Sequence, residues 1–320
     1  MFSFKGLQRV GGVALLAAIA PSPPIVPAAG SRVAFVDLID HPTQEANWGR
    51  FHSLEDRLAG AFHDACADGG CVTRRFLWPM QLRCSVQRPQ ATVAACVWVV
   101  AGSDLTVSAT GHITPDVTVW RCLLPLPTSI AVEQFHAALE VQDPLSARLP
   151  GASATLRQGV QDCLAAAGDT HMTPLLMLAV AAMSPSPAHV DARDYPLPGQ
   201  GAAGFAAMEQ ALVRGFDDLC GDTFCEGDYG NLRALQLRCS VTARSGIVAE
   251  CAWSFAGSHA TVTGNDPLPV VEARTWICRL PLAPATPLPV LLSTLSGRDA
   301  LDTRLPGRDI STYDALTDCL

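Results

Sequence analysis

The hexapeptide QLRCSV occupies residues 81–86 and recurs unchanged at residues 236–241. Its cysteine belongs to a longer pattern, because the twelve cysteines fall into two sets of six with matching spacing. The offset between corresponding cysteines grows only from 154 to 156 residues along the chain. This spacing indicates a tandem duplication of one cysteine-bearing domain. The first set is Cys66, Cys71, Cys84, Cys96, Cys122 and Cys163, and the second is Cys220, Cys225, Cys239, Cys251, Cys278 and Cys319.

The repeat sets the expected domain boundaries. A period this long indicates two whole domains, because solenoid units repeat every ~20 to 50 residues. We expect a signal peptide at 1–30, an N-terminal extension at 31–50, a first six-cysteine domain at 51–164, a linker at 165–204 and a second domain at 205–320.

Each copy reads as an α+β domain of about 115 residues. Apolar residues at three- and four-residue spacing predict a helix over 51–65 and another over 205–219. Alternating apolar and polar residues then predict about four antiparallel strands in the first copy, at 82–86, 96–100, 105–107 and 117–124. Helices near 132–139 and around Cys163 complete the expected fold, with the helices on one face of the sheet.

An even number of cysteines at repeated spacing favours disulfides formed in an oxidising compartment. Zinc is the competing interpretation, but zinc sites use closely spaced ligands, and the copies share no histidine. If the turn at 88–90 centres a hairpin, Cys84 lies opposite Cys96, and Cys239 lies opposite Cys251 by the same argument. We therefore expect three disulfides in each copy: Cys66–Cys71, Cys84–Cys96 and Cys122–Cys163, then Cys220–Cys225, Cys239–Cys251 and Cys278–Cys319.

The N-terminus resembles a secretory signal. Lys5 and Arg9 precede a short apolar run at 13–20, which is too short to span a membrane. We expect cleavage after Ala29 or Gly30, no transmembrane span in the mature chain, and a periplasmic or secreted protein. Lys5 is the only lysine among 22 basic residues, a bias typical of a GC-rich bacterial coding sequence.

The linker contains a second apolar run at 174–183, followed by Pro/Ser residues as at the N-terminus. We interpret it as the relic of a duplicated signal peptide that stays in the mature chain. Two alternatives are a small helix that docks on a domain and a fusion of two reading frames at Met172. Residues 1–30 hold two basic and no acidic residues, so the mature chain would be more acidic than the net −8 of the full chain. That sign argues against nucleic acid and anionic membranes as partners.

Few polar residues occur in both copies, and these define the candidate sites. Arg83 and Arg238 are either anion-binding groups or surface ion-pair partners of a carboxylate such as Glu55 or Asp64. Trp98 and Trp253 are either core residues against disulfides or an aromatic platform for a glycan or peptide. Ser103 and Ser258 follow glycine, but the second glycine of a nucleophile elbow is missing, so we expect a tight turn there.

Metal binding has one candidate, a calcium site at Asp222, Glu226 and Asp228, although the spacing is not that of an EF-hand. We otherwise expect no metal and no cofactor. The preferred hypothesis is that these acidic residues attract Arg74 and Arg75 across a domain interface, or face a charged partner.

Without a shared histidine, a Ser-His-Asp site in both copies is excluded. We therefore expect an exported, disulfide-stabilised tandem-repeat protein that acts as a non-catalytic binding module for an envelope component, a glycan or a protein. Two tethered copies would raise the effective ligand concentration at the second site. The alternatives are a secreted hydrolase with one active copy and an inhibitor of an extracellular enzyme, so whether the protein is an enzyme stays open.

Overall fold

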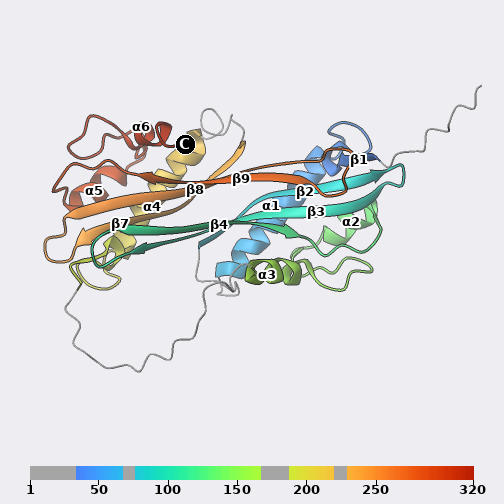
Figure 1. Cartoon of the computed structure of the whole chain (residues 1–320), viewed down its shortest axis with the longest axis horizontal. Coiled ribbons are helices and arrows are strands. Elements are labelled where there is room, and N and C mark those ends of the chain that lie inside the picture. The colour runs from blue at the N-terminus through green and yellow to red at the C-terminus, as the bar shows by residue number, and fades with distance from the viewer. Residues whose placement is uncertain (1–33, 68–75, 167–186, 220–228) are drawn as a thin grey trace, which may run out of the picture. The chain divides into compact units, whose positions relative to one another are not determined.

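The computed structural model describes residues 34–67, 76–166, 187–219 and 229–320. Within these residues the fold is α+β, with two antiparallel sheets and several helices (Figure 1). One sheet and its helices come from residues 34–166, which we call the first half. The other sheet and its helices come from residues 187–320, the second half.

The first half contains an antiparallel sheet in the order β1-β2-β3-β4, with a short fifth strand paired to β3. Its strands are β1 (Ala34–Asp37), β2 (Phe76–Arg88), β3 (Thr92–Val107), β4 (Ile113–Leu123) and β5 (Ile130–Ala131). Its helices are a 3-10 helix (Leu38–Asp40), α1 (Trp48–Ala67), α2 (Val132–Leu139) and α3 (Leu156–Ala166).

The second half repeats this order of elements except for β5, in whose place its described residues form only the isolated bridge between Ile247 and Pro287. Its strands lie in the order β6-β7-β8-β9. The strands are β6 (His189–Asp191), β7 (Asn231–Thr242), β8 (Val248–Thr261) and β9 (Val270–Arg279). The helices are a 3-10 helix (Ala192–Asp194), α4 (Ala202–Leu219), α5 (Leu288–Leu295) and α6 (Thr312–Thr317). No helix in the described parts of either half is long and apolar enough to cross a membrane.

The strands expected at 96–100 and 105–107 form one continuous strand, β3, so the turn expected at Ser103 is wrong. Glycine is required there by packing. A Cβ atom on Gly102 would lie 2.6 Å from the Trp120 ring, and one on Gly257 would lie 3.1 Å from the Trp276 ring. The absence of a side chain lets each tryptophan of the neighbouring strand lie against the sheet.

The edge strands β1 and β6 lie in segments that we had assigned to the N-terminal extension and the linker. Asp37 and Asp191 end these strands, and each side chain accepts a hydrogen bond from the backbone two residues later, at 3.0 and 2.9 Å. Each aspartate thereby caps a 3-10 helix. The sequence signal is Asp-x-x-Asp-x-Pro at 37–42 and 191–196, which recurs at the same 154-residue offset as the first cysteines.

A carboxylate from the long helix of each half meets an irregularity in the adjacent strand. The β2–β3 register shifts between Pro79 and Gln81, and the β7–β8 register shifts between Ala234 and Gln236. The next backbone N–H donates to the helix, from Leu82 to Glu55 at 2.8 Å and from Leu237 to Glu209 at 2.9 Å. The two shared glutamates therefore hold the sheet to the helix in the same way.

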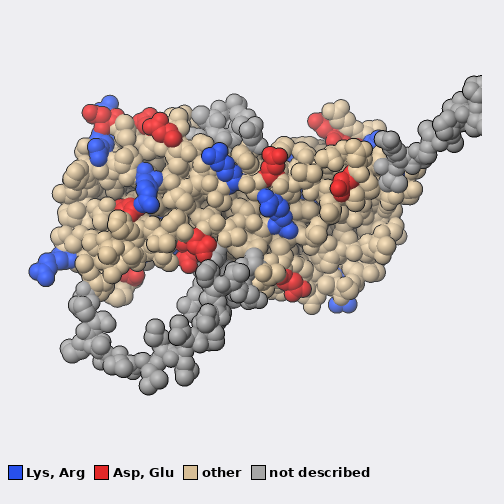
Figure 2. Space-filling view, viewed as in Figure 1, with Lys and Arg blue, Asp and Glu red and all other residues tan. Residues whose placement is uncertain are grey.

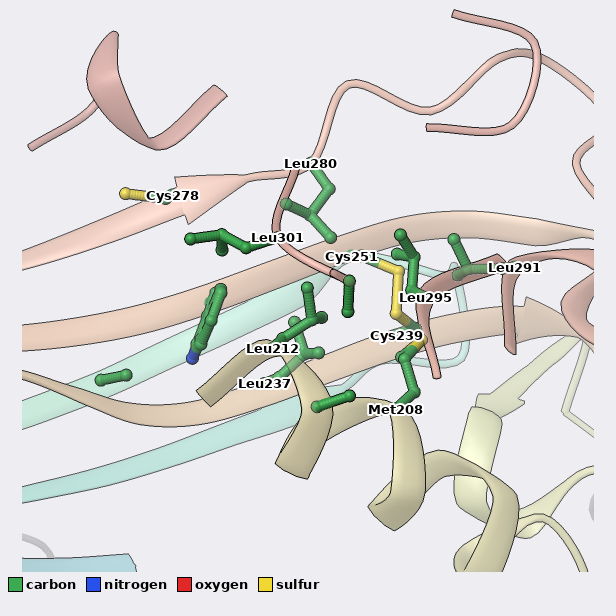
Figure 3. Close-up of a cluster of buried hydrophobic side chains, with 14 of the residues drawn as sticks. Met208, Leu212, Leu237, Cys239, Cys251, Cys278, Leu280, Leu291, Leu295 and Leu301 are labelled. Atoms are coloured by element: carbon green, nitrogen blue, oxygen red, sulfur yellow. A yellow bond between two sulfur atoms is a disulfide. The ribbon is translucent and has the colours of Figure 1, made fainter. Parts of the chain in front are cut away.

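Each half has its own core between its sheet and its helices. Figure 3 shows the second core, where Met208 of α4 and Leu291 and Leu295 of α5 lie close to the Cys239–Cys251 disulfide. Trp98 and Trp253 are 1% and 0% exposed at the centres of the two cores. They are core residues, so neither of them forms an exposed aromatic platform.

Four disulfides join described cysteines, and they are four of the six expected pairs. Two cross-link neighbouring strands at opposed register positions, and two link β4 or β9 to the C-terminal segment of its half. The remaining expected pairs, Cys66–Cys71 and Cys220–Cys225, include residues outside the described part of the chain. The four are Cys84–Cys96, Cys122–Cys163, Cys239–Cys251 and Cys278–Cys319.

The sheet faces that turn away from the helices pack against each other. Val99 and Ala101 of β3 form a buried apolar cluster with Leu235 of β7 and Ala256 of β8. Leu105 of the first half and Ala252 of the second belong to another such cluster. Each central strand is therefore buried on both faces, by helices on one side and by the other sheet on the opposite side.

Candidate functional site

The arginines present in both halves lie where the two sheets meet. Arg83 Nε donates to the carbonyl oxygen of Ala260 in the other half at 3.1 Å, and lies 3.5 Å from the carboxylate of Asp37. Arg238 Nε lies 3.4 Å from the carboxylate of Asp191. Both arginines form ion pairs, but the partner is the edge-strand aspartate and not Glu55 or Asp64, because β1 and β6 lie directly beside β2 and β7. Arg238 is buried, so the surface position expected from the sequence is wrong for this residue.

The shared serines connect the halves reciprocally. The Ser85 hydroxyl donates to the carbonyl of Pro267, and the Ser240 hydroxyl donates to the carbonyl of Gly111. Pro267 and Gly111 are themselves 156 residues apart, so the two contacts occupy corresponding places. The interface between the halves accordingly has approximate twofold character.

The polar centre of this interface is less symmetric. The Gln236 side-chain oxygen accepts from the Leu105 backbone N–H at 2.8 Å and from the Ser103 hydroxyl at 3.3 Å. Ser103 Oγ also lies 2.8 Å from Ser254 Oγ. In the first half, the corresponding Gln81 side-chain oxygen is buried without a hydrogen-bond partner. Ser103 therefore has a structural role in joining the sheets.

A cavity of about 360 Å³ opens beside this interface, and we call it the junction cavity. One wall comes from the beginning of β2 in the first half. The other walls come from the 3-10 helix, α4 and β7 of the second half. Its lining residues are Phe76, Trp78, Arg193, Glu209, Gln210, Val213, Arg214, Ala234, Leu235, Gln236 and Arg238.

The polar side of the junction cavity is rich in arginine. Asp191 lies 3.5 Å from Arg193 Nε and 3.4 Å from Arg238 Nε, so one carboxylate faces two guanidinium groups. Burial lowers the pKa of Arg238, and the positive charge of Arg193 lowers it further. Burial also raises the pKa of Glu209, which opposes its negative charge. Arg214 adds a third guanidinium from the exposed side of α4.

The apolar wall consists of two aromatic side chains. The Phe76 and Trp78 rings are stacked, with centroids 6.1 Å apart and planes inclined by 20°. The His63 ring meets the Trp78 ring edge-on at 4.7 Å. Phe76 is 39% exposed, so part of its ring is open to solvent. The wall thus offers a flat apolar surface next to fixed positive charges.

Most of the residues that give the cavity this chemistry have no equivalent at the corresponding position of the other half. Glu209, Gln236 and Arg238 have counterparts in Glu55, Gln81 and Arg83. At the cysteine offsets of 154 and 155, however, the other lining residues are replaced. Phe76, Trp78, Arg193 and Arg214 correspond to Asn231, Arg233, Ile39 and Gly60 respectively. The junction cavity therefore has an aromatic wall and additional arginines, whereas the equivalent position on the other side of the interface does not.

Two further cavities border the interface. One of about 780 Å³ shares Arg193 and Arg238 with the junction cavity and also contains Asp104 and His189. Another of about 520 Å³ contains His112 and Glu250, whose Nδ1 and Oε2 atoms are 3.6 Å apart. On the face drawn in Figure 2, acidic and basic side chains are interspersed. The concentration of arginine at the junction cavity is therefore the sharper electrostatic feature.

The calcium candidate and the loop hypothesis both fall outside the described residues, because Asp222, Glu226, Asp228, Arg74 and Arg75 all do. Among the described side chains, no group of three or more His, Cys, Asp or Glu residues is arranged to hold a metal ion.

The comparison of the two copies selected Arg238 as a candidate but excluded Arg193, Trp78 and Phe76, which are not repeated. These residues could have been found by the opposite comparison, which looks for a cluster of positions at which the otherwise similar halves differ. No protein-family model matches the chain, and neither a curated protein nor a solved structure matches it at a significant level.

Proposed function

We propose that this is an exported binding protein that takes a small organic ligand into the junction cavity. The observation that carries the proposal is the pairing of two unlike walls. The stacked Phe76 and Trp78 rings come from one half, and the Arg193 and Arg238 guanidinium groups come from the other. An apolar pocket with a few fixed polar groups is the usual form of a ligand site.

We infer that the two halves arose by tandem duplication and that each carries three disulfides. The matching order of elements, the four disulfides at corresponding places and the paired serine contacts support this. In this history the duplication first built the interface between the halves. One of the two equivalent positions at this interface then acquired an aromatic wall and became the ligand site.

Export to the periplasm or the cell exterior is supported by the disulfides and by the apolar N-terminal run after Lys5 and Arg9. In that compartment the ligand would be a small component of the envelope or its surroundings.

A hydrolase with one active half is the second candidate. It is favoured by the unrepeated His112 beside Glu250 in a cavity. The Glu250 carboxylate, however, already accepts the Ile113 backbone N–H at 3.1 Å and pairs with Arg279. A carboxylate committed to these contacts is better suited to holding the interface than to orienting a catalytic histidine, so binding is the preferred function.

The proposal is tested by filling the mouth of the cavity. Gln210 is an exposed lining residue on α4, and Asp56 is its exposed counterpart on α1, outside the junction cavity. The variants Gln210→Trp and Asp56→Trp therefore make the same change at corresponding places. Each is exported, purified, incubated with the small-molecule fraction of an envelope extract and examined by native mass spectrometry.

We expect a small-molecule adduct on the wild-type protein and on Asp56→Trp, and its loss from Gln210→Trp. Adducts of equal mass and abundance on all three proteins would place binding outside the junction cavity. Hydrolysis of extract components that disappears in His112→Ala would favour the second candidate.

A further inference from the structure

We propose that the junction cavity binds an arene monocarboxylate, with its ring against Trp78 and Phe76 and its carboxylate on Arg193 and Arg238. This inference rests on the proposed function and specifies its ligand class.

The two guanidinium groups suit a carboxylate. Asp191 contacts each group through Nε, at 3.5 Å for Arg193 and 3.4 Å for Arg238. One terminal nitrogen of Arg238 donates to the Leu237 carbonyl at 2.9 Å, which fixes that group in place. A ligand carboxylate would bind through terminal nitrogens, in the forked arrangement that guanidinium and carboxylate groups favour.

The charge of the site suits a single negative charge. The cavity lining holds the guanidinium groups of Arg193, Arg214 and Arg238 and the carboxylate of Glu209, so the lining carries a net positive charge. Asp191, which pairs with Arg193 and Arg238, and Asp104, which also acts on Arg238, lie outside the lining and offset part of it. This charge lies in a chain whose overall net charge is −8. A monoanion suits this positive lining and repels Glu209 and Asp191 less than a dianion would. The raised pKa of Glu209 is consistent with a site in which negative charge is already costly.

The aromatic wall and the volume suit a compact flat body. The Phe76 and Trp78 rings are inclined by only 20° and both line the cavity, so a ligand ring can pack against them. The cavity volume of about 360 Å³ lies near the lower end of the ~300–1,000 Å³ usual for ligand pockets. A ring with one short acidic substituent fits these limits better than an oligosaccharide or a folded partner.

Four probes separate the ring from the charge: benzoate, benzyl alcohol, acetate and phenyl phosphate. Their binding to the full mature protein is measured by titration calorimetry and by Trp fluorescence. We expect benzoate to bind more tightly than the other three. Arg193→Met should weaken benzoate binding by about tenfold or more and leave benzyl alcohol nearly unchanged, because it removes one charge-assisted contact.

The matched control is Arg244→Met, which removes the same charge from the exposed β7–β8 turn outside the cavity lining. It should change benzoate binding less than about twofold, because exposed charges are screened. Arg193→Lys keeps the charge without the fork and should give an intermediate loss. Phe76→Ala changes an exposed ring and should weaken benzoate and benzyl alcohol together, so it tests the wall even if Arg193→Met is poorly folded.

Several results would overturn the ligand class. If benzyl alcohol binds as tightly as benzoate and Arg193→Met has no effect, the ligand does not need a carboxylate. If acetate binds as tightly as benzoate and Phe76→Ala has no effect, the ligand does not need an aromatic ring. If phenyl phosphate binds more tightly than benzoate, the ligand class is an aryl phosphate and not an arene monocarboxylate.

Failure of all four probes, while an extract adduct is still blocked by Gln210→Trp, would reject the arene monocarboxylate and leave the proposed function standing. If that adduct is also absent, the proposed function itself fails.

Discussion

The Glu209 side chain on α4 accepts a hydrogen bond from the backbone N–H of Leu237, 2.9 Å away in β7. The carboxylate lies beside the register shift between β7 and β8. It therefore accepts a hydrogen bond from a backbone N–H next to an irregularity in the strand pairing. Burial raises the pKa of Glu209 above its ordinary value of 4.5. The same group therefore holds helix to sheet and makes the stability of the protein depend on pH.

The sign of this dependence follows from the raised pKa. The folded state holds the proton of Glu209 more strongly than the unfolded state does. The contribution of this group to stability is therefore full below the ordinary pKa, and is lost as the pH rises through the folded-state pKa. We expect Glu209→Gln to gain unfolding free energy relative to wild type across that pH range. Urea unfolding at a series of pH values from 4 to 7 measures the difference.

Two further variants complete the Glu209 experiment. Glu209→Leu leaves the Leu237 N–H without its acceptor and should cost about 1–3 kcal/mol at every pH. Glu272→Gln changes an exposed carboxylate on β9 and should show no comparable pH trend. A pH-independent difference between Glu209→Gln and wild type would contradict the assigned cause.

The contact between the two sheets predicts a second effect. Ala101 is 0% exposed in the apolar cluster that joins β3 to the second half. Ala101→Asp would place an unpaired carboxylate there, and we expect a loss of about 3–5 kcal/mol in unfolding free energy. Thr106→Asp makes a similar change at an exposed position of the same strand and should stay within ~0.5 kcal/mol. Similar unfolding midpoints for the two variants would mean that the halves are held together by something else.

The core that each half builds for itself could be predicted from the sequence because it depends on local patterns. The three- and four-residue spacing gave the long helices, which are α1 and α4. The turn-centred positions of Cys84 and Cys96, and of Cys239 and Cys251, gave the strand-to-strand disulfides. These features need no knowledge of what lies beyond one hairpin or one helix.

The packing between the halves could not be predicted in the same way. Cys96, Trp98 and Val100 line one face of β3, and Val97 and Val99 line the other, so the strand is apolar on both faces. That pattern is typical of a strand covered on both sides, but it does not say what covers the second side. Arg83 lies on the face of the sheet away from the helices, where it meets the other half. The surface that meets it, the Ala260 carbonyl in β8, comes from 177 residues away.

The candidate site was missed for a related reason. Its aromatic wall and its arginines lie in different halves, and only tertiary packing brings Trp78 to Arg193. Comparing the two halves selected the polar residues that they share, and those residues lie at the interface between the halves. The residues with distinctive chemistry are those that the copies do not share. The polar positions that the two halves share thus described the scaffold, and the positions at which they differ marked the candidate site.

The disulfides should differ in their effect on stability. Cys84 and Cys96 are separated by 12 residues, and Cys122 and Cys163 by 41. Because a longer closed loop restricts the unfolded chain more, loss of Cys122–Cys163 should cost about 1 kcal/mol more. Urea unfolding of the two double-alanine variants measures this difference. The corresponding pairs of the second half have the same separations and provide the control, so an opposite order there would contradict the chain-entropy explanation.

The apolar segment at 174–183 leads to a prediction about processing. It follows the pattern of the N-terminal apolar run, yet Lys5 and Arg9 precede that run, and only His171 stands close before this one. Export signals use a basic region before the apolar run, so the segment should escape cleavage and the two halves should stay joined. We expect the intact mass of the exported protein to fit one chain that begins near residue 30 or 31. Because Trp78 and Arg193 lie in different halves, two fragments without the segment would mean that the junction cavity forms only if separate chains associate.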